Sequence, residues 1–127
     1  MKTLLFAMPL LLVAHSASAQ DAAAGEKVFL QCRACHQVGE TAKNAVGPLL
    51  NGLFGRKSGT IAGYNYSDAN KNSGITWDEA VFVEYIKDPK AKIPGTKMVY
   101  AGLKDEKRIA DLIAYLKQFD ASGKKTP

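Results

Sequence analysis

The sequence lacks a hydrophobic run long enough for a typical membrane-spanning helix. Its longest one, the uncharged, Leu-rich segment 4–13, holds about ten residues, against the roughly twenty that cross a bilayer. Lys2 precedes this segment and the small residues 17–19 follow it, which is typical of a cleaved export signal and makes a retained membrane anchor the less favoured alternative. We therefore expect a signal peptide over residues 1–19, cleaved after Ala19, and one small domain over residues 20–127.

The chain also lacks a dense run of basic residues. Seventeen Lys and Arg stand against twelve Asp and Glu, a formal net charge of +5; without Lys2, sixteen against twelve leave +4. Because the basic residues are scattered among acidic ones, this balance favours acidic partners and argues against a nucleic-acid-binding surface. We expect the Lys-containing tail, residues 123–127, to be solvated.

Residues that build metal sites are scarce. Once residues 1–19 are removed, the chain holds one His (His36), one Met (Met98), one Trp (Trp77) and two Cys (Cys32 and Cys35). A structural zinc site uses four Cys or His ligands. Only three such residues remain, crowded within five positions, so this kind of site is disfavoured.

What the sequence does contain is the pentapeptide CRACH (residues 32–36), which unites both cysteines with the remaining histidine. Two thiols at this spacing near the end of a helix lie on one side of the backbone, where they can form thioethers with the two vinyl groups of one haem. His36 is then held against the iron as an axial ligand. In an exported chain this pattern predicts one covalently attached haem c.

Two other interpretations of the Cys pair stay open. A dithiol oxidoreductase of the thioredoxin type needs a βαβ context, and no run of alternating β-branched residues lies near Cys32 and Cys35. A plain structural disulfide is the second.

The remaining pattern predicts an all-α domain with long ordered loops. Helices are expected over residues 22–31, 67–71, 76–87 and 105–119. The Gly-rich segment 39–63 is too long for a free loop, and packing on a haem face would order it.

Sequence patterns define the ends of one of these helices and the buried face of another. Thr76 and Glu79 form a capping box at the start of the third, and Asp88-Pro89 is expected to stop it. The last helix has apolar residues at the i, i+3, i+4, i+7 spacing of a buried stripe. These residues are Ile109, Leu112, Ile113 and Leu116.

Residues 25–116 resemble a class I c-type cytochrome, similar to mitochondrial cytochrome c and to the small soluble cytochromes c of purple bacteria. The resemblance follows chain order through seven segments. They are CRACH (32–36), GPL (47–49), GLFGRK (52–57), YSDANKN (66–72), GITW (74–77), PGTKM (94–98) and DLIAYL (111–116).

The resemblance implies that Met98 is the second axial ligand, whereas a lone Met taken by itself is more simply core filler. With His36 and Met98 both on the iron, it implies a soluble one-electron carrier and not an enzyme. A thioether opposite an imidazole favours Fe(II) and raises the reduction potential. A ligand-sensing or peroxidase-like haem protein is the alternative within haem chemistry, and the Met pattern argues against it.

Further residues around the haem take implied roles. The Pro48 carbonyl would accept a hydrogen bond from His36. Three residues would bind the buried propionates, although each has an ordinary alternative as a core aromatic or a surface charge: Arg56, Tyr66 and Trp77. Three more would form a small polar group beside the Met ligand: Asn70, Tyr85 and Thr96.

The resemblance also implies membrane-bound redox partners, such as a cytochrome bc complex and a terminal oxidase or a photosynthetic reaction centre. The export signal makes the periplasm the expected compartment, and we expect a monomer that does not insert into the membrane. Docking is expected near the lysines of the haem-edge rim, which are Lys27, Lys90, Lys97 and Lys104.

The chain departs from the family pattern around this edge. Tyr100 stands where many relatives have Phe, which adds a hydroxyl that needs a partner. Gln31, Ala45 and Asp105 occupy positions that are often basic in relatives, so we expect weaker or less salt-sensitive docking than in the most basic members.

Overall fold

The computed structural model describes residue 9 and residues 20–126. The expected signal peptide, apart from Pro9, and its cleavage site behind Ala19 lie outside the described residues. The described part is helical, as expected, with isolated bridges at Lys57–Thr76 and Phe119–Lys125 and no longer strand pairing. Its helices are α1 (Ala22–Phe29), α2 (Asp68–Lys71), α3 (Glu79–Lys87), α4 (Pro89–Lys92) and α5 (Glu106–Lys117).

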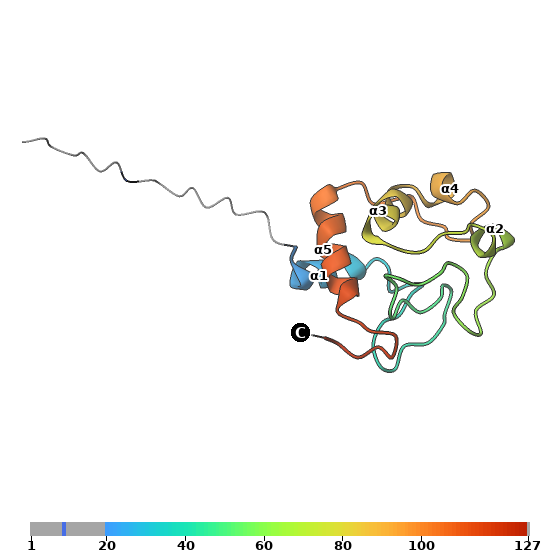
Figure 1. The fold of residues 1–127 in the computed structure, drawn as a ribbon, viewed down its shortest axis with the longest axis horizontal. Helices are drawn as coiled ribbons and strands as arrows, with labels where there is room; N and C mark the ends of the chain where they lie inside the picture. Colours follow the sequence, from blue (N-terminus) through green and yellow to red (C-terminus); the bar gives the residue numbers. More distant parts are fainter. Residues whose placement is uncertain (1–8, 10–19, 127) are drawn as a thin grey trace, which may run out of the picture.

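The main packing contact joins the first and last helices, which cross at one end of the molecule (Figure 1). Gly25 makes the close approach possible, because a Cβ there would lie 1.9 Å from the Asp111 carbonyl oxygen. Phe29 of α1 packs against Tyr115 of α5 with 5.4 Å between ring centroids. The stripe expected on the last helix is fully buried in this core.

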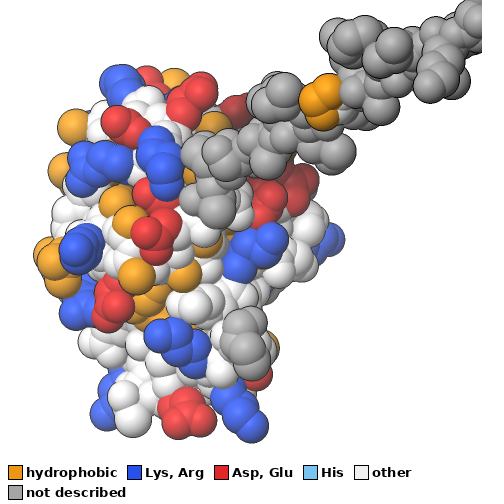
Figure 2. All heavy atoms as spheres, turned by 90° about the vertical axis from the view of Figure 1, so that its left-hand side faces the viewer, with side chains coloured by type: hydrophobic (Ala, Val, Ile, Leu, Met, Phe, Trp, Pro, Cys, Tyr) orange, Lys and Arg blue, Asp and Glu red, His pale blue; other side chains and the backbone are white. Residues whose placement is uncertain are grey.

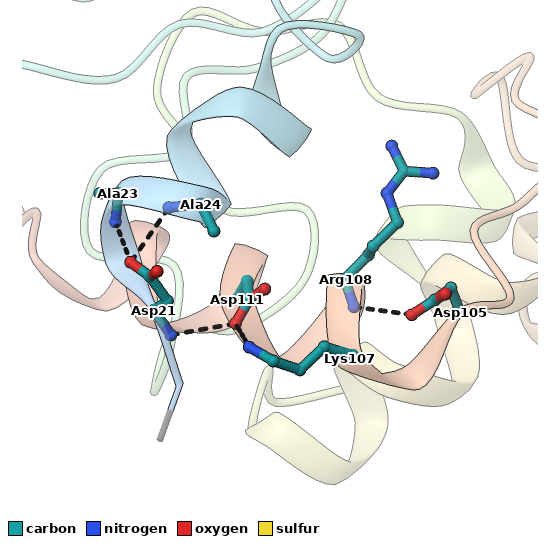
Figure 3. A network of polar contacts seen from close by, with 7 residues as sticks. All are labelled: Asp21, Ala23, Ala24, Asp105, Lys107, Arg108 and Asp111. Atoms are coloured by element: carbon teal, nitrogen blue, oxygen red, sulfur yellow. Dashed lines mark hydrogen bonds and ion pairs between the residues drawn. The ribbon is translucent and has the colours of Figure 1, made fainter. Parts of the chain in front are cut away.

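A buried carboxylate ties the start of α1 to α5 (Figure 3). One oxygen of Asp111 accepts the backbone N–H of Asp21 at 3.0 Å and the ammonium of Lys107. The Lys107 hydrogen bond, followed by the one from Asp21, lowers the pKa of Asp111 below its usual value. Asp21 in turn caps α1 by accepting from the N–H groups of Ala23 and Ala24.

The capping box expected at Thr76 is wrong. Thr76 pairs with Lys57 as an isolated bridge, and the neighbouring Trp77 N–H donates to the Arg56 carbonyl at 2.9 Å, so this segment is held extended. Helix α3 begins two residues later than a cap at Thr76 would allow, with Asp78 accepting from the Val81 N–H at 2.8 Å.

The chain also remains helical beyond the expected stop. Asp88 ends α3 and at the same time caps α4, where its carboxylate accepts from the Ala91 N–H. Pro89 occupies the first helical position, where its missing N–H costs nothing. At the other end of the fold, α1 ends at Phe29, earlier than expected, and turns carry the chain on to the cysteines.

The expectation of a solvated tail is wrong in part. The Lys124 and Lys125 side chains are exposed, but the backbone folds back on the end of α5, where Thr126 N–H donates to the Gln118 carbonyl at 2.7 Å. Gly123 is buried against Gly39. The tail thus contacts both the end of α5 and the start of the Gly-rich loop.

Candidate functional site

A cavity of about 360 Å³ opens between the end of α1, the long loop, α3 and the segment before α5. Its lining is mostly apolar, with contributions from Phe29, Leu53 and Phe82 of the core. Every site residue expected from the sequence contributes to this one lining. These residues are Cys32, Cys35, His36, Pro48, Arg56, Tyr66, Asn70, Trp77, Tyr85, Thr96 and Met98.

The two thiols lie on the turns that follow α1. Cys32 N–H donates to the Phe29 carbonyl at 2.8 Å, and His36 N–H donates to the Cys32 carbonyl at 2.9 Å, so one turn carries the whole pentapeptide. Both thiols are free and half-buried. Burial, together with the neighbouring Cys35, raises the pKa of Cys32 to about 11. A thiol of this kind stays protonated at neutral pH, unlike the nucleophilic thiol of a dithiol oxidoreductase.

The imidazole of His36 is held in place by the backbone of Gly47 and Pro48. Its Nδ1 lies 2.7 Å from the Pro48 carbonyl oxygen, a distance that places the ring proton on Nδ1 and leaves the Nε2 lone pair for a metal. Burial lowers the pKa of His36, which favours the neutral, ligating form. Gly47 lets the backbone pass close to the ring, since a Cβ there would lie 2.4 Å from His36 Cε1.

Two hydroxyl groups lie beside Met98, and one of them contacts its sulfur. The Tyr85 hydroxyl donates to Met98 Sδ at 3.3 Å and lies 3.3 Å from Thr96 Oγ1. Thr96 Oγ1 also accepts the Met98 backbone N–H at 3.3 Å. Burial raises the pKa of Tyr85, so its hydroxyl remains a donor at neutral pH. Trp77 packs edge-on against Tyr85, with 4.9 Å between ring centroids.

Asn70 lies in the cavity wall but not within this group. Its side-chain oxygen accepts from the Ser58 hydroxyl at 2.5 Å, and its backbone N–H donates to Ser67. No hydrogen bond joins Asn70 to Met98, Tyr85 or Thr96 among the described residues. Ser58 is a buried polar residue that sequence patterns do not single out, because a lone Ser in a Gly-rich loop carries no distinguishing pattern.

Two of the three residues expected around buried carboxylates, Arg56 and Tyr66, lie near each other on the loop side of the cavity, and the Trp77 ring lies beside Tyr85. Arg56 Nη1 donates to the Leu49 and Asn51 carbonyls at 3.1 and 3.2 Å. Burial lowers the pKa of Arg56, yet a guanidinium of this kind stays charged at neutral pH. The Tyr66 hydroxyl accepts the Ile61 N–H at 3.1 Å, which leaves its own proton free to donate.

The donor set fits a haem and not a free metal ion. Across residues 20–126, no three His, Cys, Asp or Glu side chains gather as a metal ion would require. A large apolar cavity with two thiols, one imidazole and one thioether in its wall instead matches a flat, apolar macrocycle whose iron takes two axial ligands. No helix of the described residues is long and apolar enough to cross a membrane.

Comparison with known proteins gives consistent matches. The cytochrome c family model matches residues 22–120. The chain is 72% identical over 109 residues to cytochrome c2 of Blastochloris viridis, covering 86% of each chain. It is 68% identical over 106 residues to a cytochrome c2 of Rhodoplanes tepidamans, covering 84% of this chain and 99% of the relative.

A solved structure agrees with the fold. That of cytochrome c2 from Rhodospirillum centenum superposes with a TM-score of 0.75 at 41% identity, covering 79% of this chain and 98% of that one. The chain belongs to the cytochrome c family: it is a class I c-type cytochrome, an electron-transfer protein and not an enzyme, and it carries one covalently attached haem c.

Proposed function

We propose that this cytochrome shuttles single electrons between membrane-bound redox complexes in the periplasm, with Cys32 and Cys35 as the haem attachment points and His36 and Met98 as the axial ligands. The observation that carries this proposal is that an imidazole and a thioether, 62 positions apart in the chain, line the same apolar cavity as the thiol pair. The haem supplies the redox-active iron, and every other part of the function depends on how the chain's own residues surround it.

The hydrogen bond with Pro48 prepares His36 to ligate iron. A hydrogen bond from Nδ1 to the Pro48 carbonyl fixes the tautomer, restricts ring rotation and raises the basicity of Nε2. The close backbone of Gly47 limits tilting of the ring. These contacts hold the ligand in one orientation in both oxidation states, which keeps structural rearrangement small during electron transfer.

Met98 is prepared in a different way. A thioether sulfur has two lone pairs, and the Tyr85 hydroxyl occupies one of them, so the other remains for iron. A sixth ligand supplied by the protein excludes oxygen and other small molecules from the iron unless Met98 is displaced. This supports outer-sphere electron transfer over the sensing or peroxidase-like alternative.

Arg56, Tyr66 and Trp77 supply donors where a haem propionate would otherwise be buried without a partner. Such burial of a carboxylate is costly without hydrogen bonds. The free proton of the Tyr66 hydroxyl and the charge of Arg56 support this role. Asn70 would have an indirect role: it accepts a hydrogen bond from Ser58 and so fixes the loop that carries Arg56.

Docking is proposed at the rim lysines. None of Lys27, Lys90, Lys97 and Lys104 takes part in an ion pair with another described residue, although Lys97 and Lys104 donate to backbone carbonyls. Figure 2 shows a face that includes parts of α1 and α5, where basic and acidic side chains are interspersed with small groups of exposed hydrophobic ones. Uncompensated lysines attract an acidic partner more strongly than a mixed surface does.

Two separate experiments test the proposal, one for covalent attachment of the haem and one for ligation of the iron by Met98. Acidified organic solvent should not extract the haem, and the intact mass should be that of residues 20–127 plus one haem if the signal is cleaved after Ala19. Met98→Ala should then let carbon monoxide bind the reduced protein readily and should lower the reduction potential. Extractable haem would refute thioether attachment, and an unchanged spectrum and potential in Met98→Ala would refute ligation by Met98.

A further inference from the structure

Two of the four family departures at the cavity edge, Tyr100 and Gln31, contact each other. The hydroxyl of Tyr100 donates to Oε1 of Gln31 at 3.1 Å, across 69 positions of sequence. Gln31 directly precedes Cys32 on the turn after α1, and Tyr100 follows Met98 by two residues. Both side chains line the cavity wall. This hydrogen bond therefore connects the thiol side of the cavity with the thioether side.

The segment that Tyr100 belongs to has few other attachments. We call residues 98–102 the Met98 segment. Before it, Lys97 Nζ donates to the Asn65 carbonyl at 2.7 Å, and after it Leu103 N–H donates to the Ile86 carbonyl at 2.8 Å. Among the described residues, positions 99–102 form a single hydrogen bond, and it is the one from Tyr100 to Gln31.

Packing holds the end of the segment, where a Cβ on Gly102 would lie 2.1 Å from the Lys87 carbonyl oxygen, but it holds the middle only at Tyr100. Val99 is 90% exposed and Ala101 is exposed, while the Tyr100 ring is half-buried against the hydrophobic core. Tyr100 is thus the point at which the middle of the Met98 segment is held, by ring packing and by its hydroxyl. Gln31 sits on the more constrained side, because its backbone N–H bonds to the Val28 carbonyl and its neighbour Cys32 bonds to Phe29.

We propose that the Tyr100–Gln31 hydrogen bond is a latch that holds the Met98 segment closed over the cavity and limits how fast Met98 is displaced by an external ligand. Both are positioning residues, since neither ligates and each acts through Met98. The inference rests on the proposed ligation by Met98. Opening of the segment must break this bond before the thioether moves away, so its loss should raise the opening rate.

The test uses the ferric holoprotein and imidazole as the external ligand, followed by stopped-flow absorbance. If Met98 must leave first, the binding rate should saturate with imidazole at the opening rate. Tyr100→Phe keeps the ring and removes the hydroxyl, and it should raise the saturated rate about two- to tenfold, the range that one neutral hydrogen bond supports. Gln31→Leu should do the same, whereas Gln31→Glu retains an acceptor and should stay close to the parent.

A double variant and a matched control distinguish loss of this one hydrogen bond from a general loss of stability. Tyr100→Phe with Gln31→Leu should open no faster than either single variant, because both remove the same bond. Thr60→Val deletes an exposed hydroxyl outside the cavity lining, one that donates to the Lys57 carbonyl at 2.6 Å, and it should leave the opening rate unchanged. In denaturant unfolding, each single variant should lose no more stability than one hydrogen bond accounts for.

The experiment distinguishes failure of the latch from failure of the proposed ligation by Met98. A saturating rate that Tyr100→Phe leaves unchanged, or additive effects in the double variant, would overturn the latch while ligation by Met98 stands. A rate that rises linearly with imidazole and equals that of Met98→Ala would overturn ligation by Met98, and the latch with it.

Discussion

The hydroxyl of Tyr85 and the sulfur of Met98 lie 3.3 Å apart, and Thr96 closes a ring between them. Thr96 Oγ1 accepts the Met98 backbone N–H and lies 3.3 Å from the Tyr85 oxygen. The sulfur is therefore oriented from two directions, through its own lone pair and through its backbone. A thioether whose lone pair is partly engaged donates less electron density to a metal, which favours the reduced state.

Tyr85→Phe should accordingly lower the reduction potential. With Met98 as the proposed ligand, loss of the hydroxyl makes its sulfur the stronger donor and stabilises Fe(III). The loss of one neutral hydrogen bond, about 0.5–1.5 kcal/mol, corresponds to about 20–65 mV for a one-electron couple. Redox titration measures this shift, and Thr60→Val, which removes an exposed hydroxyl outside the cavity lining, is the control. An unchanged or raised potential would show that the hydroxyl does not act on the sulfur.

Gly47→Ala should weaken the His36 side of the cavity. The added methyl would lie 2.4 Å from His36 Cε1, so the ring or the loop must move. We expect a loss of about 1–3 kcal/mol in the free energy of unfolding, the usual cost of overpacking, and a lower yield of holoprotein. Ala45→Val enlarges an exposed residue of the same loop and should have little effect. Equal behaviour of the two variants in denaturant unfolding would contradict the close-approach argument.

Asp111→Asn should destabilise the α1–α5 contact in a pH-dependent way. The pKa of Asp111 is lowered in the folded protein, so its charged form stabilises the fold above its unfolded value of 3.8. This contribution is lost as pH falls through the lower, folded value. The stability difference between parent and variant should therefore be about 1 kcal/mol or more at pH 7 and should shrink below about pH 4.

Thermal unfolding across pH 3–7 measures this difference for Asp111→Asn. Glu40→Gln offers a control, because its exposed carboxylate forms no hydrogen bond with the described residues. A difference that stays constant with pH would mean that the Asp111 charge is not what stabilises the contact.

Charge reversal of the rim should slow electron transfer to an acidic partner. Lys27→Glu and Lys90→Glu are the sharpest variants, because these two side chains form no hydrogen bond or ion pair with the described residues. The bimolecular rate should fall with each change and also with added salt, since the Debye length shrinks to about 8 Å at physiological ionic strength. Stopped-flow rates over a salt series provide the measurement.

Lys124→Glu with Lys125→Glu is the control for net charge. Both side chains are exposed on the tail, away from the cavity lining, and their reversal should change the rate little. A larger effect from the tail pair than from the rim pair would place docking on another face.

Local patterns were enough where the controlling interactions lie close in sequence. The CRACH pentapeptide, the apolar stripe of the last helix and the absence of β-branched alternation pointed to a helical haem protein, and the structure and the relatives agree. The same holds for the set of cavity residues, which the resemblance identified and which the fold brings into one lining.

Long-range contacts decided the rest. Thr76 has good capping chemistry, but pairing with Lys57 holds it extended, so Asp78 becomes the cap. Asp88-Pro89 looks like a stop, yet the same residues begin α4. The lysines of the tail predicted a solvated segment. The hydrogen bond from the Thr126 N–H to the Gln118 carbonyl cannot be predicted from composition, because it depends on how the chain folds back.

The sequence by itself determined the cofactor class, because attachment needs only two thiols and an imidazole at fixed spacing on one turn. It also showed that the hydroxyl of Tyr100 needs a partner. Only the tertiary structure decided that this partner is Gln31, since the two residues are 69 positions apart and meet only when the segment after Met98 folds back onto the end of α1. Hydrogen bonds between distant segments depend on the packing of the whole chain, and no local spacing encodes them.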